Sequence, residues 1–289
     1  MKEEKIFYDP EKQADNTGLL KGIEQTLKIG NIPFVRHRTT STATYIQGDK
    51  IIKVLPKNTG INGNFIGRVK KHFNDLPLPE HLSADRPYYE YFRPISTYEE
   101  IDNLCEIDLT AAYYTAANEL GYLTKELYDK AFDGTVNKVS RLVAMGTLGK
   151  RTVTAEFEPP YSKVIEKESF DRNRVFWDNI VYTVGEVMRE VVARYKLYVY
   201  GMWFDAIFVE RSVAENIRKF LAYRGYPAKV ESIKSYVVKP KDGFIPGAEI
   251  VRIYANGKSK SMQVNYLSED DKMITFEQFL SKVAKSAYI

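Results

Sequence analysis

Two apolar segments, each carrying an aspartate, constrain the fold of this 289-residue chain most strongly. The first is Leu104–Asp108, and the second runs from Gly201 to Val209 and contains Asp205. A carboxylate among bulky apolar neighbours is costly unless it is paired or bound to a metal ion. We therefore expect two neighbouring strands whose acids share a divalent cation, and hard oxygen ligands favour Mg²⁺ or Mn²⁺. Taken singly, each aspartate is equally well explained as a turn or cap residue.

The pattern of apolar residues predicts an α+β fold around these two segments. Helices are expected over 18–29, 62–73, 110–120, 124–132, 136–148, 169–195, 212–223 and 275–286. Asn62 and Ser212 are expected to cap the helices that begin at them. Strands are expected over 32–35, 42–46, 50–55, 104–108, 152–157, 197–199, 207–209 and 228–238.

Composition excludes several classes of protein. A single cysteine, Cys105, excludes an internal disulfide and a multi-cysteine zinc site. The formal charge of +4 does not by itself indicate a nucleic-acid partner, although residues 36–38 and 68–72 form basic patches. The chain has no apolar run of about 18 residues and no hydrophobic signal core at its start. We therefore expect a soluble, cytoplasmic protein with no membrane partner.

Four short motifs, in this order, resemble those of family B DNA polymerases. Residues 108–114 resemble motif A (D-x-x-S-L-Y-P), and residues 141–149 resemble motif B (K-x-x-x-N-S-x-Y-G). Residues 200–208 resemble motif C (Y-x-D-T-D-S), and 234–236 match the K-x-Y element of the phage and protein-primed branch. The resemblance covers about residues 101–240, and the order of the motifs carries more weight than any one of them.

The resemblance implies two-metal-ion transfer of nucleotides to a DNA 3′ end. Asp108 and Asp205 would be the catalytic residues and would hold Mg²⁺ or Mn²⁺. Leu109 and Thr110 would offer backbone groups to the triphosphate near the start of a helix. Tyr113 would stack under the sugar and disfavour a 2′ hydroxyl.

The same resemblance assigns the remaining site residues. Arg141 would bind the triphosphate in place of the motif B lysine, with help from Lys138 one helical turn earlier. Gly149 would let its helix lie close to the nascent base pair. Lys234 and Tyr236 would hold the primer strand. As single residues, Arg141 reads equally as a solvated helix residue and Gly149 as a helix C-cap.

The fold implied is a polymerase-like palm, an antiparallel sheet backed by helices. Residues 1–100 would form an N-terminal α+β region, 101–240 the palm with reduced helical-hairpin fingers at about 122–150, and 241–289 a small thumb. The implied partners are a DNA primer and template, deoxynucleoside triphosphates and replication proteins. The compact form, without exonuclease motifs, suggests a phage or mobile element acting in the host cytoplasm.

Three departures from the family pattern keep other functions open. Trp203 stands in place of the first motif C acid, and Met145 and Leu148 replace the motif B asparagine and tyrosine. One alternative is a degenerate palm that binds nucleic acid or a replication protein without catalysis. A primase-like or template-independent transferase is a variant of the enzyme hypothesis, and a chance order of motifs in an ordinary α+β domain is the third possibility.

Overall fold

The computed structural model describes residues 2–9, 17–39, 42–57, 61–79, 90–159, 165–170, 172–241 and 247–266. The chain is mixed α+β, as predicted. It divides into two compact units, each made of two stretches of sequence. The first unit comprises Met1–Pro79 and Lys125–Trp177, and the second comprises Glu80–Thr124 and Asp178–Ile289.

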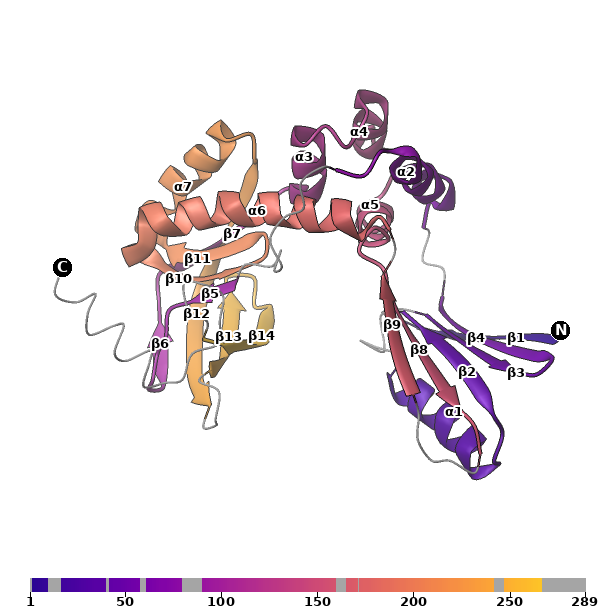
Figure 1. Ribbon diagram of the computed structural model, residues 1–289. Helices are drawn as coiled ribbons and strands as arrows, with labels where there is room; N and C mark the ends of the chain where they lie inside the picture. Colours follow the sequence, from indigo (N-terminus) through magenta and orange to yellow (C-terminus); the bar gives the residue numbers. More distant parts are fainter. Residues whose placement is uncertain are drawn as a thin grey trace. The chain divides into compact units, whose positions relative to one another are not determined.

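The first unit contains a six-stranded sheet in the order β1-β4-β3-β2-β8-β9 (Figure 1). Strand β1 is parallel to β4, and the other neighbours are antiparallel. Its strands are β1 (Lys2–Tyr8), β2 (Phe34–Arg38), β3 (Ala43–Gln47), β4 (Lys50–Pro56), β8 (Arg151–Phe157) and β9 (Ile165–Phe170). Helix α1 (Thr17–Ile29) contributes Leu20 and Leu27 to the buried cluster on this sheet.

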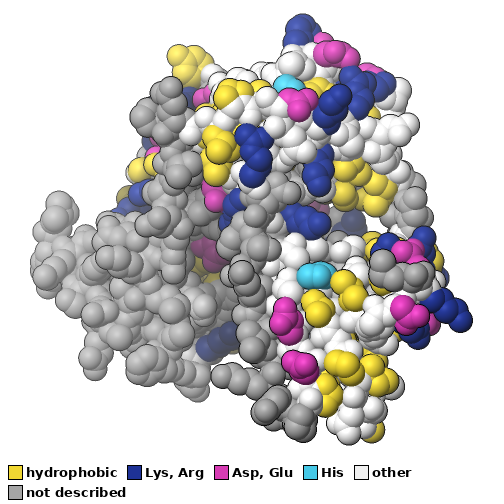
Figure 2. Space-filling model, turned by 45° about the vertical axis from the view of Figure 1, so that its right-hand side comes forward, with side chains coloured by type: hydrophobic (Ala, Val, Ile, Leu, Met, Phe, Trp, Pro, Cys, Tyr) yellow, Lys and Arg dark blue, Asp and Glu magenta, His cyan; other side chains and the backbone are white. Residues whose placement is uncertain are grey.

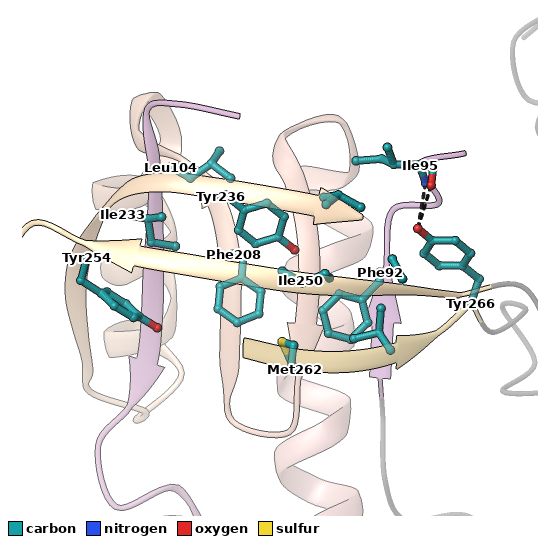
Figure 3. Packing of buried hydrophobic residues seen from close by; sticks show 13 residues of the cluster. Phe92, Ile95, Leu104, Phe208, Ile233, Tyr236, Ile250, Tyr254, Met262 and Tyr266 are labelled. Atoms are coloured by element: carbon teal, nitrogen blue, oxygen red, sulfur yellow. Dashed lines mark hydrogen bonds between the residues drawn. The ribbon is translucent and has the colours of Figure 1, made fainter. Parts of the chain in front are cut away.

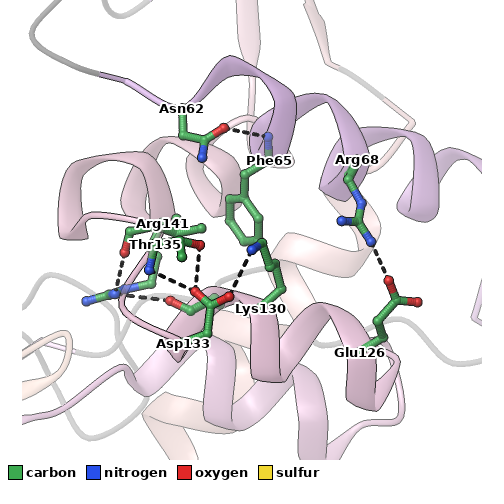
Figure 4. A network of polar contacts seen from close by, with 10 residues as sticks. Asn62, Phe65, Arg68, Glu126, Lys130, Asp133, Thr135 and Arg141 are labelled. Atoms are coloured by element: carbon green, nitrogen blue, oxygen red, sulfur yellow. Dashed lines mark hydrogen bonds and ion pairs between the residues drawn. The ribbon is translucent and has the colours of Figure 1, made fainter.

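Three further helices of the first unit are joined at their starting residues. These are α2 (Gly63–Asp75), α4 (Lys125–Phe132) and α5 (Lys138–Gly146). The Asn62 side chain accepts a hydrogen bond from the Phe65 N–H at 3.0 Å, which confirms the predicted cap (Figure 4). Asn137 caps α5 in the same way, accepting from the Ser140 N–H at 2.8 Å. The Ser140 hydroxyl accepts from the Asn62 N–H at 2.7 Å, so one serine links both caps.

The second unit contains an antiparallel sheet in the order β14-β13-β12-β7-β11-β10-β5, with β6 paired to β12. Its strands are β5 (Glu90–Phe92), β6 (Glu99–Ile101), β7 (Leu104–Leu109), β10 (Val199–Trp203), β11 (Ala206–Glu210), β12 (Ala228–Lys241), β13 (Gly247–Tyr254) and β14 (Ser259–Asn265). Helix α3 (Ala112–Glu119) follows β7, and the 3-10 turn η1 (Lys196–Tyr198) precedes β10. Strand β7, which carries Asp108, therefore lies inside the sheet and has a partner on each side.

The two faces of this sheet are covered differently. Helix α7 (Arg211–Tyr223) contacts β7, β11 and β12, and helix α6 (Arg174–Tyr195) runs across the same sheet (Figure 1). An ion pair between Arg224 and Glu190 at 3.3 Å joins the two helices. On the other face, Leu104, Phe208, Ile250 and their neighbours form a buried apolar cluster (Figure 3). Because alternate strand residues point to opposite faces, Glu106 and Asp108 lie on the face of Leu104, away from the helices.

Several predicted elements differ from the structure. Residues 165–170 form strand β9, so the long helix begins at Arg174 and not at 169. Helix α7 has Glu210 at its N-cap without a side-chain cap bond, so Ser212 is not the cap. Strands β1, β5, β6, β13 and β14 were not predicted, and the helix expected over 275–286 lies outside the described residues.

The division into units also differs from the predicted domain boundaries. The proposed fingers, residues 122–150, fall almost entirely in the unit that contains the N-terminal strands. Residues 247–266, expected in a thumb, instead form β13 and β14 and extend the sheet that carries Asp108.

Candidate active site

The two predicted acids lie at adjoining ends of two paired strands. Asp108 is directly opposite Ala206, the first residue of β11, and Asp205 immediately precedes that alanine. The Leu109 N–H donates to the Asp205 carbonyl at 2.9 Å, which makes Asp108 and Ala206 a non-hydrogen-bonded pair. Since opposed Cα atoms in such pairs are about 4.5 Å apart, those of the two aspartates are on the order of 6 Å apart. Both acids are half-buried.

The backbone beside each acid is in an unusual conformation. Phe204 and Asp205 form the two-residue loop between β10 and β11, and Phe204 has a φ of 56°. Ala111, the N-cap of α3, has a φ of 58°. A positive φ costs a non-glycine residue about 1–2 kcal/mol, and such residues concentrate at functional sites. The sharp turn at Phe204 places Asp205 at the end of the hairpin, and the turn at Ala111 ends the strand of Asp108.

A row of five residues crosses the sheet at this end. Trp203 lies opposite both Glu90 and Ala206, and Asp108 lies opposite both Ala206 and Lys229. Directly opposed residues share a face, so all five side chains stand on the face away from the helices. The indole of Trp203, in place of the family's first motif C acid, packs against the apolar cluster. Lys229 is exposed, and its place beside Asp108 was not predicted.

A buried polar cluster lies next to this row. Glu106 is two residues before Asp108, on the same face, and is 8% exposed. It accepts a hydrogen bond from the Tyr254 hydroxyl, and the Arg252 Nη1 lies 3.4 Å from its carboxylate. Burial raises the pKa of Tyr254, and the bond to Glu106 raises it further. Since β12 separates β7 from β13, these contacts hold β7 in place from two strands away.

The predicted triphosphate donors are already used within the protein. The Leu109 N–H donates to Asp205, as described above, and the Thr110 N–H donates to the Pro227 carbonyl at 2.7 Å. These two N–H groups would reach a phosphate only by breaking those bonds, so the predicted role of Leu109 and Thr110 as N–H donors is not available in this structure. Tyr113 is half-buried in the first turn of α3.

Helix α3 is itself held at its far end. The Tyr226 hydroxyl donates to the Glu119 carboxylate at 2.5 Å. Burial raises the pKa of Tyr226, and the hydrogen bond to Glu119 raises it further. Together with the Thr110–Pro227 bond, this contact fixes α3 to the loop that precedes β12.

Arg141 braces the connection between two helices of the first unit. Its Nη1 donates to the carbonyls of Ala131 at 3.1 Å and Val136 at 2.9 Å (Figure 4). Its guanidinium also lies 5.0 Å from the centre of the Phe132 ring. The carbonyls in the last turn of a helix have no partner within it, which explains the contact with Ala131 at the end of α4. Lys138, at the start of α5, is exposed. The structure describes both residues only within their own unit.

Packing accounts for Gly149. An ideal Cβ there would lie 2.7 Å from the Trp177 Cδ1, closer than real Cβ atoms approach. The indole of Trp177 therefore requires glycine at this position.

The two residues of the K-x-Y element have different environments. Lys234 is exposed at a β-bulge of β12, between Ile233 and Ser235. Tyr236 is 1% exposed, lies in the apolar cluster of Figure 3 and contacts the rings of Tyr200 and Phe208. Its hydroxyl has no hydrogen-bond partner in the described structure, and burial raises its pKa. Lys234 is therefore placed to meet a DNA strand, whereas Tyr236 is a core residue whose hydroxyl is not accessible to one.

The basic patches are partly neutralised. Arg36 is 7% exposed and forms an ion pair with Glu24, and Arg68 pairs with Glu126 at 2.6 Å. Arg172 donates to two backbone carbonyls, those of Asn74 and Leu76, and so keeps an uncompensated charge in these contacts. Figure 2 shows Lys and Arg side chains gathered on the surface between the two described histidines. A polyanion could be attracted to this surface.

The ligand chemistry of the site suits one hard cation. Mg²⁺ is commonly held by one or two carboxylates together with water and substrate phosphates, which matches Asp108 and Asp205. Within the described ranges, no three His, Cys, Asp or Glu side chains are grouped to hold a metal ion. The site therefore lacks the further acid that a second ion would require.

Comparisons with known proteins give no family assignment. No protein-family model matches the chain, and no curated protein matches it. Among the described helices, none is long and apolar enough to cross a membrane.

Proposed function

We propose that the chain is a DNA polymerase-like nucleotidyltransferase that adds nucleotides to a DNA 3′ end in the cytoplasm. The observation that carries the proposal is the meeting of Asp108 and Asp205, far apart in sequence, at adjacent residues of a strand pair. A sheet with helices on one face and the acids on the other is also what a polymerase palm requires.

The residues of this site would divide the work as follows. Asp108 and Asp205 hold a divalent cation, which when bound supplies positive charge to the reacting phosphate. Tyr113 and the start of α3 border the place of the nucleotide, and Lys234 holds the primer backbone. In the reaction, the 3′ oxygen bonds to the α-phosphorus while the bond from that phosphorus to the bridging oxygen breaks. Pyrophosphate leaves, and the hydroxyl proton passes to solvent.

Primer extension tests this proposal. The purified chain with Mg²⁺ or Mn²⁺ and deoxynucleoside triphosphates should lengthen a labelled primer on a template. Asp108→Asn and Asp205→Asn should each lower the rate at least a hundredfold, whereas Asp102→Asn, an exposed aspartate outside the site, should not. Extension that persists in both site variants would reject the assigned residues. Extension without a template would indicate the template-independent form of the enzyme.

Non-catalytic binding of nucleic acid is the second candidate function. Trp203 in place of an acid and the use of Arg141 within its own unit both favour it. It predicts salt-dependent DNA binding without divalent ions and no extension by the wild-type chain. Its partners would be single-stranded DNA and replication proteins.

A further inference from the structure

We propose that Lys229 is a phosphate-binding residue of this site, and that the site holds one divalent cation where two-metal enzymes hold two. The inference rests on the proposed function and deepens it. Its starting point is the register of β7 and β12, which places Lys229 directly opposite Asp108.

The register fixes where the Lys229 side chain starts. The bond from the Thr110 N–H to the Pro227 carbonyl makes Leu109 and Ala228 a non-hydrogen-bonded pair. Asp108 and Lys229, one step along, are therefore a hydrogen-bonded pair with Cα atoms about 5.5 Å apart and side chains on one face. Lys229 is exposed, and within the described structure no carboxylate forms an ion pair with its ammonium. Its charge is available to a ligand that binds beside Asp108.

The charges of the row favour one cation over two. Asp108 and Asp205 together carry two negative charges, which one divalent ion neutralises. A second ion would leave the site strongly positive, next to an ammonium that already repels it. The position from which the polymerase family supplies its further acid holds the apolar indole of Trp203. The ammonium of Lys229 supplies the second positive centre without a metal ion.

A lysine in this position suits a phosphate ligand. Its ammonium is a compact charge with three donors and commonly binds phosphate groups as a point charge. In nucleotidyl transfer, the electron pair of the broken bond stays on the pyrophosphate oxygen, where negative charge grows. Lys229 remains protonated throughout and takes no covalent part, so it acts by electrostatic stabilisation of the leaving group.

Calorimetric titration of the full chain with Mn²⁺, and then with inorganic pyrophosphate in the presence of Mn²⁺, tests the inference. The wild-type chain should bind one Mn²⁺ that Asp108→Asn removes. Lys229→Gln should raise the affinity for that ion roughly three- to tenfold, because a nearby like charge is removed. The same variant should weaken pyrophosphate binding by a similar factor, and Lys229→Arg should restore it. Lys241→Gln, an exposed lysine on the same strand, should change neither.

The opposite signs of the two effects separate this role from a loss of folding, which would weaken both ligands. Two Asp108-dependent ions, or unchanged affinities in Lys229→Gln, would overturn the inference and leave the proposed function standing. If no Mn²⁺ binding depends on Asp108, the inference and the metal site of the proposed function are both rejected.

Discussion

Replacing Tyr236 by phenylalanine should stabilise the protein. The Tyr236 side chain is 1% exposed, and its hydroxyl has no hydrogen-bond partner among the residues that the structure describes. Its ring packs with those of Tyr200 and Phe208, contacts that phenylalanine would keep. The substitution removes only the buried oxygen.

The expected gain follows from the cost of burying that oxygen. A buried hydroxyl without a partner costs about 1–3 kcal/mol relative to water. Because packing around the smaller side chain loses some contact, we expect Tyr236→Phe to raise the free energy of unfolding by about 1 kcal/mol. For 150–250 residues that corresponds to a rise of about 2–4 °C in Tm.

Tyr266 provides the matched control in the same cluster. Its hydroxyl donates to the Ile95 carbonyl at 2.9 Å and accepts from the Ile95 N–H at 3.2 Å (Figure 3). Tyr266→Phe should therefore lower stability by about 1–3 kcal/mol, since two buried backbone groups lose a partner. Urea unfolding followed by circular dichroism measures both variants. A loss of stability in Tyr236→Phe similar to that in Tyr266→Phe would refute the reasoning and indicate an unseen partner for the Tyr236 hydroxyl.

Two further predictions concern the first unit. Gly149→Ala should lower stability by about 1–3 kcal/mol, since its Cβ would lie 2.7 Å from the Trp177 ring, whereas Gly146→Ala, with open space around it, should change stability by less than about 1 kcal/mol; equal Tm values for the two variants would contradict this. The hydrogen bond from Lys130 is the largest of the causes that lower the pKa of Asp133 to about 2. Because the folded pKa lies below the ordinary 3.8, the contribution of this carboxylate to stability is complete above pH 3.8 and is lost as the pH falls through 2. A carbon-13 NMR titration of Asp133 should have its midpoint near pH 2, and a midpoint near 3.8 would exclude the ion pair.

Local patterns in the sequence were enough to predict much of the secondary structure. Asn62 was predicted as a cap because an N-cap needs only a side-chain acceptor and an N–H two or three residues later. The strands of Asp108 and Asp205 were predicted from their own apolar residues. What the sequence could not provide is the partner of a group that bonds at long range. Arg141 looked like a helix residue available to a triphosphate, but the carbonyls at the end of α4 accept its donors.

Strand β13 was missed for a related reason. Its inward face carries Arg252 among apolar residues, and a buried arginine breaks the expected alternation. Burial of that charge becomes favourable only beside Glu106, which is far away in sequence. Lys229 was overlooked because its relation to Asp108 depends on register, and a slip of one residue would turn it to the other face.

The bulge at Lys234 explains how one strand serves both the site and the core. Before the bulge, Lys229 and Ile233 lie on the face of Asp108, at odd positions of β12. After it, the side chains on that same face are Tyr236 and Val238, at even positions, because both belong to the cluster that contains Ile233. An uninterrupted strand cannot change parity, since its side chains alternate with a period of two, and one extra residue is what a bulge supplies. Lys234 is thus exposed and Tyr236 buried for one geometric reason, and the bulge lets β12 keep Lys229 beside Asp108 while Tyr236 fills the core.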